Sequence, residues 1–430
     1  MTASQTKRDA FGNVVDSVVG YARGTIVSDS EDETLKNLRA EQIIRRRVAE
    51  LGTDSIYVFT GMACDFPLAA EDLGALAQES VGPALFSAEL REQAIHHMGG
   101  SPEDDVAVFN RTSGGIVAVC LALCSPGETI ISLVPGAISH PSLKRGAELA
   151  GNALLEVSGI EALGEALGET AGSLVFITGV TSEQLVIPEN DLAQAIELTR
   201  EAGRVSLVDD AYGARVRTVL FGQRSALAAG ADLAITSNQK AGLTGPRAGL
   251  LVGNQALVRK ALSVATSFGQ EARGPIALGV LRSLQRYTPE RLLADVETGK
   301  ALFEAFAAAF GSNRVSPSPL GPIIEQDDVL SILVQMAGAD APSVPLVPAE
   351  ASAAVCMLLL EQSGILTANV AGAPGSRASL RLKGSAEDVR RIGGVGAVVE
   401  ALDHALDGAA NMIDDVDRVR TLLRPLPQPS

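Results

Sequence analysis

The stretch VSLVDDAYGARVRTVLFGQRSALAAGADLAITSNQKAGLTGPRAGLLVG (residues 205–253) organises the chain. It holds three apolar runs rich in β-forming residues, at 205–210, 232–236 and 248–253. Runs of this kind, bounded by turn residues, predict strands. Lysine is scarce in this protein, yet Lys240 lies between the second and third predicted strands, just before a glycine-rich turn. A solvated surface turn is the commonest place for a lysine, but a lysine held at a strand end also suits covalent chemistry through its amine.

Strands and helices alternate along the preceding part of the chain. Further strands are predicted at 106–109, 129–134 and 173–182, with helices at 116–124 and 191–203. Alternation at this pace predicts an α/β fold in which a mainly parallel sheet is sandwiched by helices. In such folds ligands bind beyond the carboxyl ends of the strands. We therefore expect the functional residues directly after strands.

The length of 430 residues suggests two or three domains. We expect an N-terminal arm and helix (residues 1–52), a large domain (53–288) and a smaller α+β C-terminal domain (289–430). Helical patterns run from 273 to 311, with a break at Pro289. For the C-terminal domain the patterns predict strands at 329–337 and 378–382 and helices at 349–364 and 386–406.

The composition of the chain limits the classes of function that we expect. The net charge is -16 and aromatic residues make up 3% of the chain, so the basic patches and stacking platforms of a nucleic-acid-binding protein are not expected. No apolar run approaches the ~20 residues that span a bilayer, and the N-terminus has no signal-like core, which predicts a cytoplasmic protein.

Four cysteines and four histidines predict no metal site, and Cys120 and Cys124 are expected to pack in the core. A small-molecule substrate is expected.

Two candidate features follow the earlier strands. Arg111, Thr112, Ser113 and Gly114 form a polar turn at a helix start, where backbone N–H groups and hydroxyls favour a phosphate. The alternative is an ordinary helix N-cap, which the same residue types form. His140 lies in the sequence GAISHPS after the next strand, where a lone histidine is more often structural than functional.

Two further candidates lie in the opening stretch. Asp209 ends an apolar strand, so its carboxylate would be partly desolvated and would need a cationic partner; the alternative is that it caps the next helix. Tyr212 follows three residues later. Lys240 would have a lowered pKa if it were desolvated near other cations, which would make its amine a better nucleophile.

The order of these features resembles that of the fold-type I pyridoxal-phosphate enzymes, the aspartate aminotransferase superfamily. The resemblance implies a seven-stranded sheet in the large domain and a site completed by a second subunit, hence a homodimer or larger homo-oligomer. It also implies a role for each candidate around pyridoxal 5'-phosphate. The phosphate would be held by the turn at 111–114 and by Ser237. His140 would stack on the pyridine ring, Asp209 would pair with the ring nitrogen and Tyr212 would touch the ring hydroxyl. Lys240 would bind the aldehyde.

A narrower likeness concerns FNRTSGG, ISHPS and QKAGLTGPRAGLLVG, which are similar to segments of bacterial selenocysteine synthase and its archaeal relatives. In the C-terminal domain, GSRASLRLKGS would place Arg377, Ser379 and Arg381 on one strand face, where an arginine suits a carboxylate. A solvated strand face is the alternative. By the resemblance Arg381 is the first choice for the substrate α-carboxylate and Arg377 the second.

Together these features predict an enzyme, a lyase or transferase, that acts on an amino acid through an external aldimine and a quinonoid. Elimination or replacement at the β or γ carbon is favoured, because the narrower likeness is to an enzyme of that chemistry. An aminotransferase is the alternative. A non-catalytic pyridoxal-phosphate-binding regulator is a remote one, since the first 50 residues offer no basic helix-turn-helix.

Overall fold

The computed structural model describes residues 7–426, except Cys64, Ala77, Ala137, Ala373 and Ser376. The chain forms two compact units, Met62–Leu293 and a second one that combines Met1–Gly61 with Ala294–Ser430. We expected domain boundaries after residues 52 and 288. The chain passes between the units a few residues later, and the N-terminal segment folds together with the C-terminal one.

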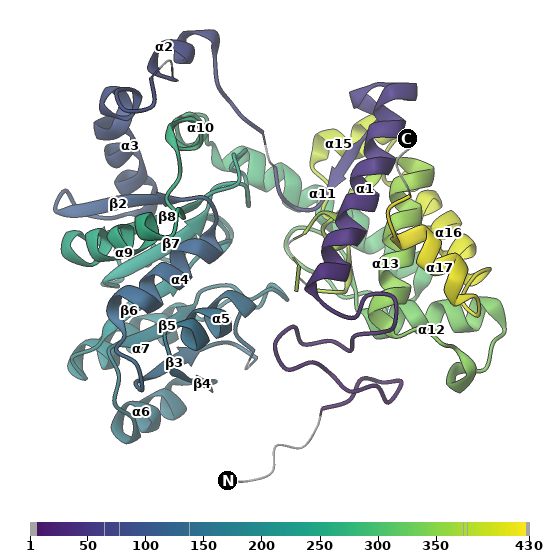
Figure 1. The fold of residues 1–430 in the computed structure, drawn as a ribbon, viewed down its shortest axis with the longest axis horizontal. Helices are drawn as coiled ribbons and strands as arrows, with labels where there is room; N and C mark the ends of the chain where they lie inside the picture. The colour runs from purple at the N-terminus through teal and green to yellow at the C-terminus, as the bar shows by residue number, and fades with distance from the viewer. Residues whose placement is uncertain are drawn as a thin grey trace. The chain divides into compact units, whose positions relative to one another are not determined.

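A seven-stranded sheet forms the centre of the unit 62–293, which confirms the predicted α/β architecture (Figure 1). The strand order is β2-β8-β7-β6-β5-β3-β4. All neighbours pair in parallel except β8, which is antiparallel to β2 and β7. The strands are β2 (Asp104–Phe109), β3 (Thr129–Leu133), β4 (Ala153–Val157), β5 (Leu174–Thr178), β6 (Val205–Asp209), β7 (Leu233–Ser237) and β8 (Gly249–Asn254).

Helices cover both faces of this sheet because successive strand residues point to opposite sides. In β6, Leu207 faces the core under α4, α5 and α9, whereas Val208 faces the core under α3, α6, α7 and α10. These two helical layers can be followed in Figure 1. The helices of the unit are α2 (Leu73–Leu76), α3 (Gly82–Met98), α4 (Thr112–Leu123), α5 (Pro141–Leu149), α6 (Ile160–Glu169), α7 (Glu189–Glu201), α8 (Gly213–Arg215), α9 (Gln255–Ser267) and α10 (Gly274–Gln285).

The second unit is mainly helical, with two small two-stranded sheets. β1 pairs with β10 in parallel, and β9 pairs with β11 in antiparallel fashion. The strands are β1 (Tyr57–Phe59), β9 (Ile323–Ile324), β10 (Ile365–Thr367) and β11 (Leu380–Arg381). The helices are α1 (Ser30–Leu51), α11 (Pro289–Phe310, which begins in the other unit), α12 (Gln326–Ala337), α13 (Pro348–Leu358), α14 (Ala368–Ala371), α15 (Ala386–Ile392), α16 (Val395–Ala410) and α17 (Val416–Leu423).

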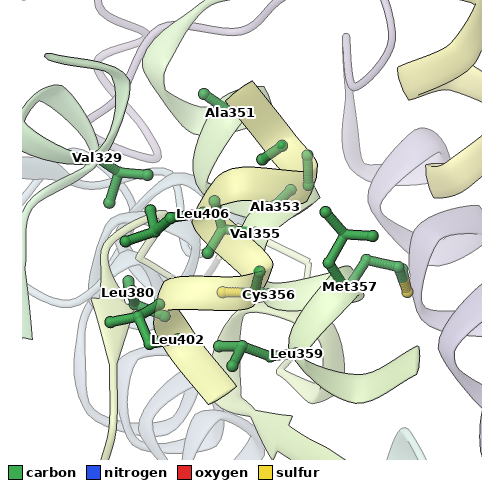
Figure 2. Close-up of a cluster of buried hydrophobic side chains, with 14 of the residues drawn as sticks. Val329, Ala351, Ala353, Val355, Cys356, Met357, Leu359, Leu380, Leu402 and Leu406 are labelled. Atoms are coloured by element: carbon green, nitrogen blue, oxygen red, sulfur yellow. The ribbon is translucent and has the colours of Figure 1, made fainter. Parts of the chain in front are cut away.

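The strand predicted at 329–337 is wrong, because these residues belong to α12. Asp327 and Asp328 occupy the first turn, where carboxylates favour the helix dipole, and Gly338 ends the helix in a left-handed conformation. The apolar residues that suggested a strand instead line one buried helical face. Figure 2 shows the core to which this face contributes, with side chains from α12, α13, α16 and β11.

The N-terminal arm is tied to α13 by one carboxylate. Oε1 of Glu350 accepts hydrogen bonds from the backbone N–H groups of Ile26 (2.5 Å) and Val27 (3.0 Å). A Cβ at Gly24 would lie 2.1 Å from the Glu350 carboxyl carbon, so this close approach needs glycine. Within the described residues, none of the helices combines the length and apolar character needed to cross a lipid bilayer.

Candidate active site

Asp209 and Lys240 lie at the carboxyl ends of adjacent parallel strands. Asp209 is the last residue of β6 and pairs in register with Ile235 of β7, which ends at Ser237, three residues before Lys240. On the other side Asp209 pairs with Thr178, the last residue of β5. Since the carboxyl ends of parallel strands share one edge of a sheet, the predicted carboxylate and the predicted lysine lie at the same edge.

Lys240 lies in a cationic environment. Its Nζ is 4.5 Å from the centroid of the Tyr212 ring. Burial lowers the pKa of the lysine to about 8, and the charges of Arg111, Arg215 and Arg247 act in the same direction, whereas Asp209 opposes them. The turn after the lysine is closed by a hydrogen bond of 2.9 Å from Asn238 Nδ2 to the Gly245 carbonyl. The amine is therefore held at the sheet edge and is easier to deprotonate than an ordinary lysine.

The two adjacent aspartates have different environments. Asp210 is fully buried and accepts two hydrogen bonds from Arg217, at 2.9 and 2.5 Å. Added Cβ atoms at Gly179 or Gly213 would lie 2.0 Å from Asp210 Oδ1, so both glycines make room for this carboxylate. Asp209 accepts a 3.1 Å hydrogen bond from Ala211 N–H, and burial raises its pKa to about 6. Asp209 is thus a desolvated carboxyl that a nearby cation would ionise.

The predicted phosphate turn lies at the start of α4. This helix begins at Thr112, four residues earlier than expected, and its first backbone bond runs from Gly115 N–H to the Arg111 carbonyl. The N–H groups of Thr112, Ser113 and Gly114 are therefore left without an intrahelical acceptor. Thr112 Oγ1 is buried and has no hydrogen-bond partner among the described residues. Free donors and a helix N-terminus suit an anion.

Ser142 links His140 to this turn. His140 precedes α5, and its Nδ1 accepts a 3.2 Å hydrogen bond from Ser142 N–H and lies 2.9 Å from Ser142 Oγ. The Ser142 hydroxyl donates to Ser113 Oγ at 2.7 Å. The structure thus brings the predicted ring-stacking histidine and a predicted phosphate residue into one chain of polar contacts. Ser142 was missed from the sequence, although its place two residues after the histidine was a usable signal.

The hydroxyl of Ser237 is engaged within its own turn. It donates to Gln239 Oε1 at 3.1 Å, and the same oxygen accepts a 3.3 Å bond from Ala248 N–H. The predicted contact between Ser237 and a phosphate stays a prediction. Two arginines whose charges act on the lysine, Arg215 and Arg247, were also missed, because neither directly follows the last residue of a strand.

Arg377 and Arg381 lie in the other unit, close to each other. Arg381 is the last residue of β11, and its Nε donates to Ser379 Oγ at 2.8 Å. Burial lowers the pKa of Arg377 to about 10, and the charge of Arg381 contributes to this shift. Two neighbouring cations favour an anionic ligand, which agrees with the chemistry expected of this segment.

Comparisons with known proteins extend these observations. A family model described as aminotransferase class I and II matches residues 69–332. A Methanothermobacter thermautotrophicus protein named UPF0425 pyridoxal phosphate-dependent protein is 36% identical over 398 residues, which cover 93% of this chain and 100% of the relative. A protein of the same name from Methanosphaera stadtmanae is 30% identical, over 88% of this chain and 96% of the relative.

Solved structures share the fold. A serine palmitoyltransferase from S. paucimobilis superimposes with a TM-score of 0.58 at 17% identity, covering 82% of this chain and 88% of that chain. The complex of SepCysS with the SepCysE N-terminal domain gives a TM-score of 0.56 at 14% identity, covering 82% and 95%. At these identities the likeness concerns the fold.

Proposed function

Because the chain belongs to the aminotransferase class I and II family, we propose that it is a pyridoxal phosphate enzyme that acts on an amino acid at the sheet edge shared by Asp209 and Lys240. One observation carries this proposal. A lysine whose pKa is lowered to about 8 and a buried carboxyl whose pKa is raised to about 6 follow adjacent strands. Pairs of groups perturbed in this way are typical of active sites. The relatives named as pyridoxal phosphate-dependent proteins support the choice of cofactor.

The described residues fit that cofactor. Thr112 Oγ1 is a buried polar atom without a partner at a helix N-terminus, which a phosphate would satisfy. We assign the phosphate to Arg111, Thr112, Ser113 and Gly114, together with Ser237. The chain as a whole carries a net charge of -16. The three arginine charges that act on Lys240 make this site locally positive, which favours a dianionic phosphate.

Each remaining residue has a distinct task in this proposal. His140 would stack on the ring, and Tyr212 would contact the ring hydroxyl. Asp209 would bind a protonated ring nitrogen, whose charge would restore the ionised form of the buried carboxyl. When bound, pyridoxal phosphate supplies a ring that withdraws electrons from the substrate α-carbon.

Lys240 has two tasks, to hold the cofactor and then to take the α-proton of the substrate. With a pKa of about 8, roughly one-tenth of the amine is neutral at pH 7, far more than for an ordinary lysine. A base with a pKa near the operating pH is the most effective. Arg381, with Arg377 as second choice, would bind the α-carboxylate.

For the reaction we favour elimination or replacement at the β or γ carbon. The similarity of FNRTSGG, ISHPS and QKAGLTGPRAGLLVG to segments of selenocysteine synthase supports this choice. Aminotransfer is the second candidate, because the matching family model is described as aminotransferase. A non-catalytic regulator that binds pyridoxal phosphate is the remote alternative. A homo-oligomer in the cytoplasm, without nucleic-acid or membrane partners, completes the proposal.

The test has two stages. Purified protein should absorb visible light, and borohydride reduction followed by peptide mapping should fix the cofactor on Lys240; a label on another lysine would overturn the assignment. Incubation with a panel of amino acids then separates the reactions. Release of ammonia or of a side-chain leaving group supports elimination or replacement, whereas stoichiometric conversion of the cofactor to pyridoxamine phosphate supports aminotransfer.

A further inference from the structure

Two arginines of the turn after β6 are buried, and among the described residues only one of them is hydrogen-bonded to a carboxylate. Arg217 pairs with Asp210. Arg215 is 1% exposed, yet its hydrogen-bond acceptors are all neutral, and its Nε has no partner within the described part of the chain. A buried charge that is not hydrogen-bonded to a carboxylate is costly to a fold, so its presence calls for an explanation.

The contacts of Arg215 join the two segments that carry the proposed site. Its Nη2 donates to the carbonyl of Ala211 (3.2 Å), two residues after Asp209, and to the carbonyl of Ser237 (2.9 Å), three residues before Lys240. Its Nη1 donates to Thr236 Oγ1 at 3.0 Å. One planar guanidinium therefore fixes the end of β7 against the turn that follows β6.

A helix below this turn supplies the fourth acceptor. His97 of α3 lies with its Nε2 3.3 Å from Arg215 Nη1, and burial together with the Arg215 charge lowers the pKa of the histidine to about 3. His97 is therefore neutral at pH 7 and accepts from the arginine. Its ring packs edge-on against Tyr287, with 4.9 Å between centroids. Burial lowers the pKa of Arg215 only to about 10, with Tyr287 and Asp210 opposing, so the guanidinium stays charged.

We propose that Arg215 is a positioning residue for Lys240: it holds the segments after β6 and β7 together and keeps a positive charge near the lysine. The proposal rests on the proposed function, in which Lys240 must supply a neutral amine. The other charged or titratable groups that act on Lys240 are Arg111, Arg247, Asp209 and the ring of Tyr212. Arg215 is bonded to the backbone of both segments, through the carbonyls of Ala211 and Ser237.

The test measures the protonation of Lys240 directly. Full-length protein stripped of cofactor is labelled with a limiting amount of acetic anhydride across a pH series, and peptide mapping gives the midpoint for Lys240, with exposed Lys260 as internal reference. Arg215→Met should move the Lys240 midpoint up by roughly one pH unit. Arg215→Lys, which keeps the charge, should leave the Lys240 midpoint close to that of the natural protein. Arg215→Gln, which keeps some hydrogen bonds and removes the charge, should behave like Arg215→Met.

Val208→Ala is the control, because it weakens the packing of β6, the buried strand that precedes Arg215, without changing any charge. It should leave the Lys240 midpoint unchanged. The proposal is overturned if neither Arg215→Met nor Arg215→Gln moves the midpoint, or if Val208→Ala moves it equally. These outcomes are separate from the proposed function, which fails when borohydride does not fix the cofactor on Lys240, whatever the titration of that lysine.

Discussion

Asp210 and Arg217 form a buried ion pair with two hydrogen bonds, directly beside Asp209, which has no arginine partner among the described residues. Two consecutive carboxyl groups therefore have separate roles. Asp210 stabilises the turn after β6, while Asp209 is the one left for a ligand.

We expect Asp210→Asn to destabilise the protein by about 3–5 kcal/mol, because it leaves Arg217 buried without its counter-ion. Urea unfolding followed by circular dichroism measures the loss. Asp209→Asn at pH 7 is the matched control and should show no loss. A loss below about 1 kcal/mol for Asp210→Asn would mean that the pair contributes little to the fold.

The second prediction concerns the stability of the cofactor-free protein as a function of pH. The pKa of Asp209 is raised to about 6 from 3.8, so its contribution to stability is present below pH 4 and is lost as the pH rises through 6. Asp209→Asn should therefore be more stable than the natural protein at pH 7, by up to about 3 kcal/mol, and equal to it at pH 4. Urea midpoints at both pH values test this, and a difference that does not change with pH contradicts it.

The same substitution should have the opposite effect on activity. Asp209→Asn should retain the cofactor but lower turnover by about 10²-fold or more, since only the charge opposite the ring nitrogen is removed. The measurement is steady-state turnover beside the visible absorbance of the bound cofactor. Unchanged turnover would refute the pairing of Asp209 with the ring.

Ser142→Ala should weaken cofactor binding by about tenfold, because it breaks the polar chain from His140 to Ser113. Loss of visible absorbance on dialysis measures the effect. Ser267→Ala, which removes a hydroxyl bonded to its own helix, serves as the control. If both variants keep the cofactor equally well, the link has no role in binding.

Arg381→Gln should raise the KM for the amino-acid substrate by about 10-fold to 100-fold, as expected when a charged hydrogen-bond donor to a carboxylate is lost. Arg377→Gln should have a smaller effect. Steady-state kinetics on the best substrate of the amino-acid panel measures both. The reverse order would make Arg377 the carboxylate residue.

The sequence was most informative where local chemistry and topology coincide. Apolar strands, with the candidate acid, histidine and lysine at or after their ends, predicted the sheet and the edge at which Asp209 and Lys240 lie, because the period of two and the turn residues are local signals. Edge strand β4 was missed, since only one of its five residues is buried and the pattern of a core strand is absent. In α12, β-branched residues resembled a strand, and packing against α13 and α16 overrode that preference.

Arg215 was missed for a different reason. Its partners Thr236 and Ser237 come 21 and 22 residues later, and His97 comes 118 residues earlier. No spacing rule connects such positions before the sheet order is known. The same applies to Ser142, whose bond to Ser113 spans 29 residues.

The carboxylate of Glu350 that receives the N–H groups of Ile26 and Val27 has a consequence for synthesis on the ribosome. The arm emerges first but is separated from its acceptor by more than 320 residues. The whole unit 62–293 is available to fold before that acceptor exists. Until residues 294–430 are made, the arm and α1 lack the segment with which they form one unit. A nascent chain stalled after residue 293 would therefore contain a folded seven-stranded sheet and an unfolded N-terminal segment.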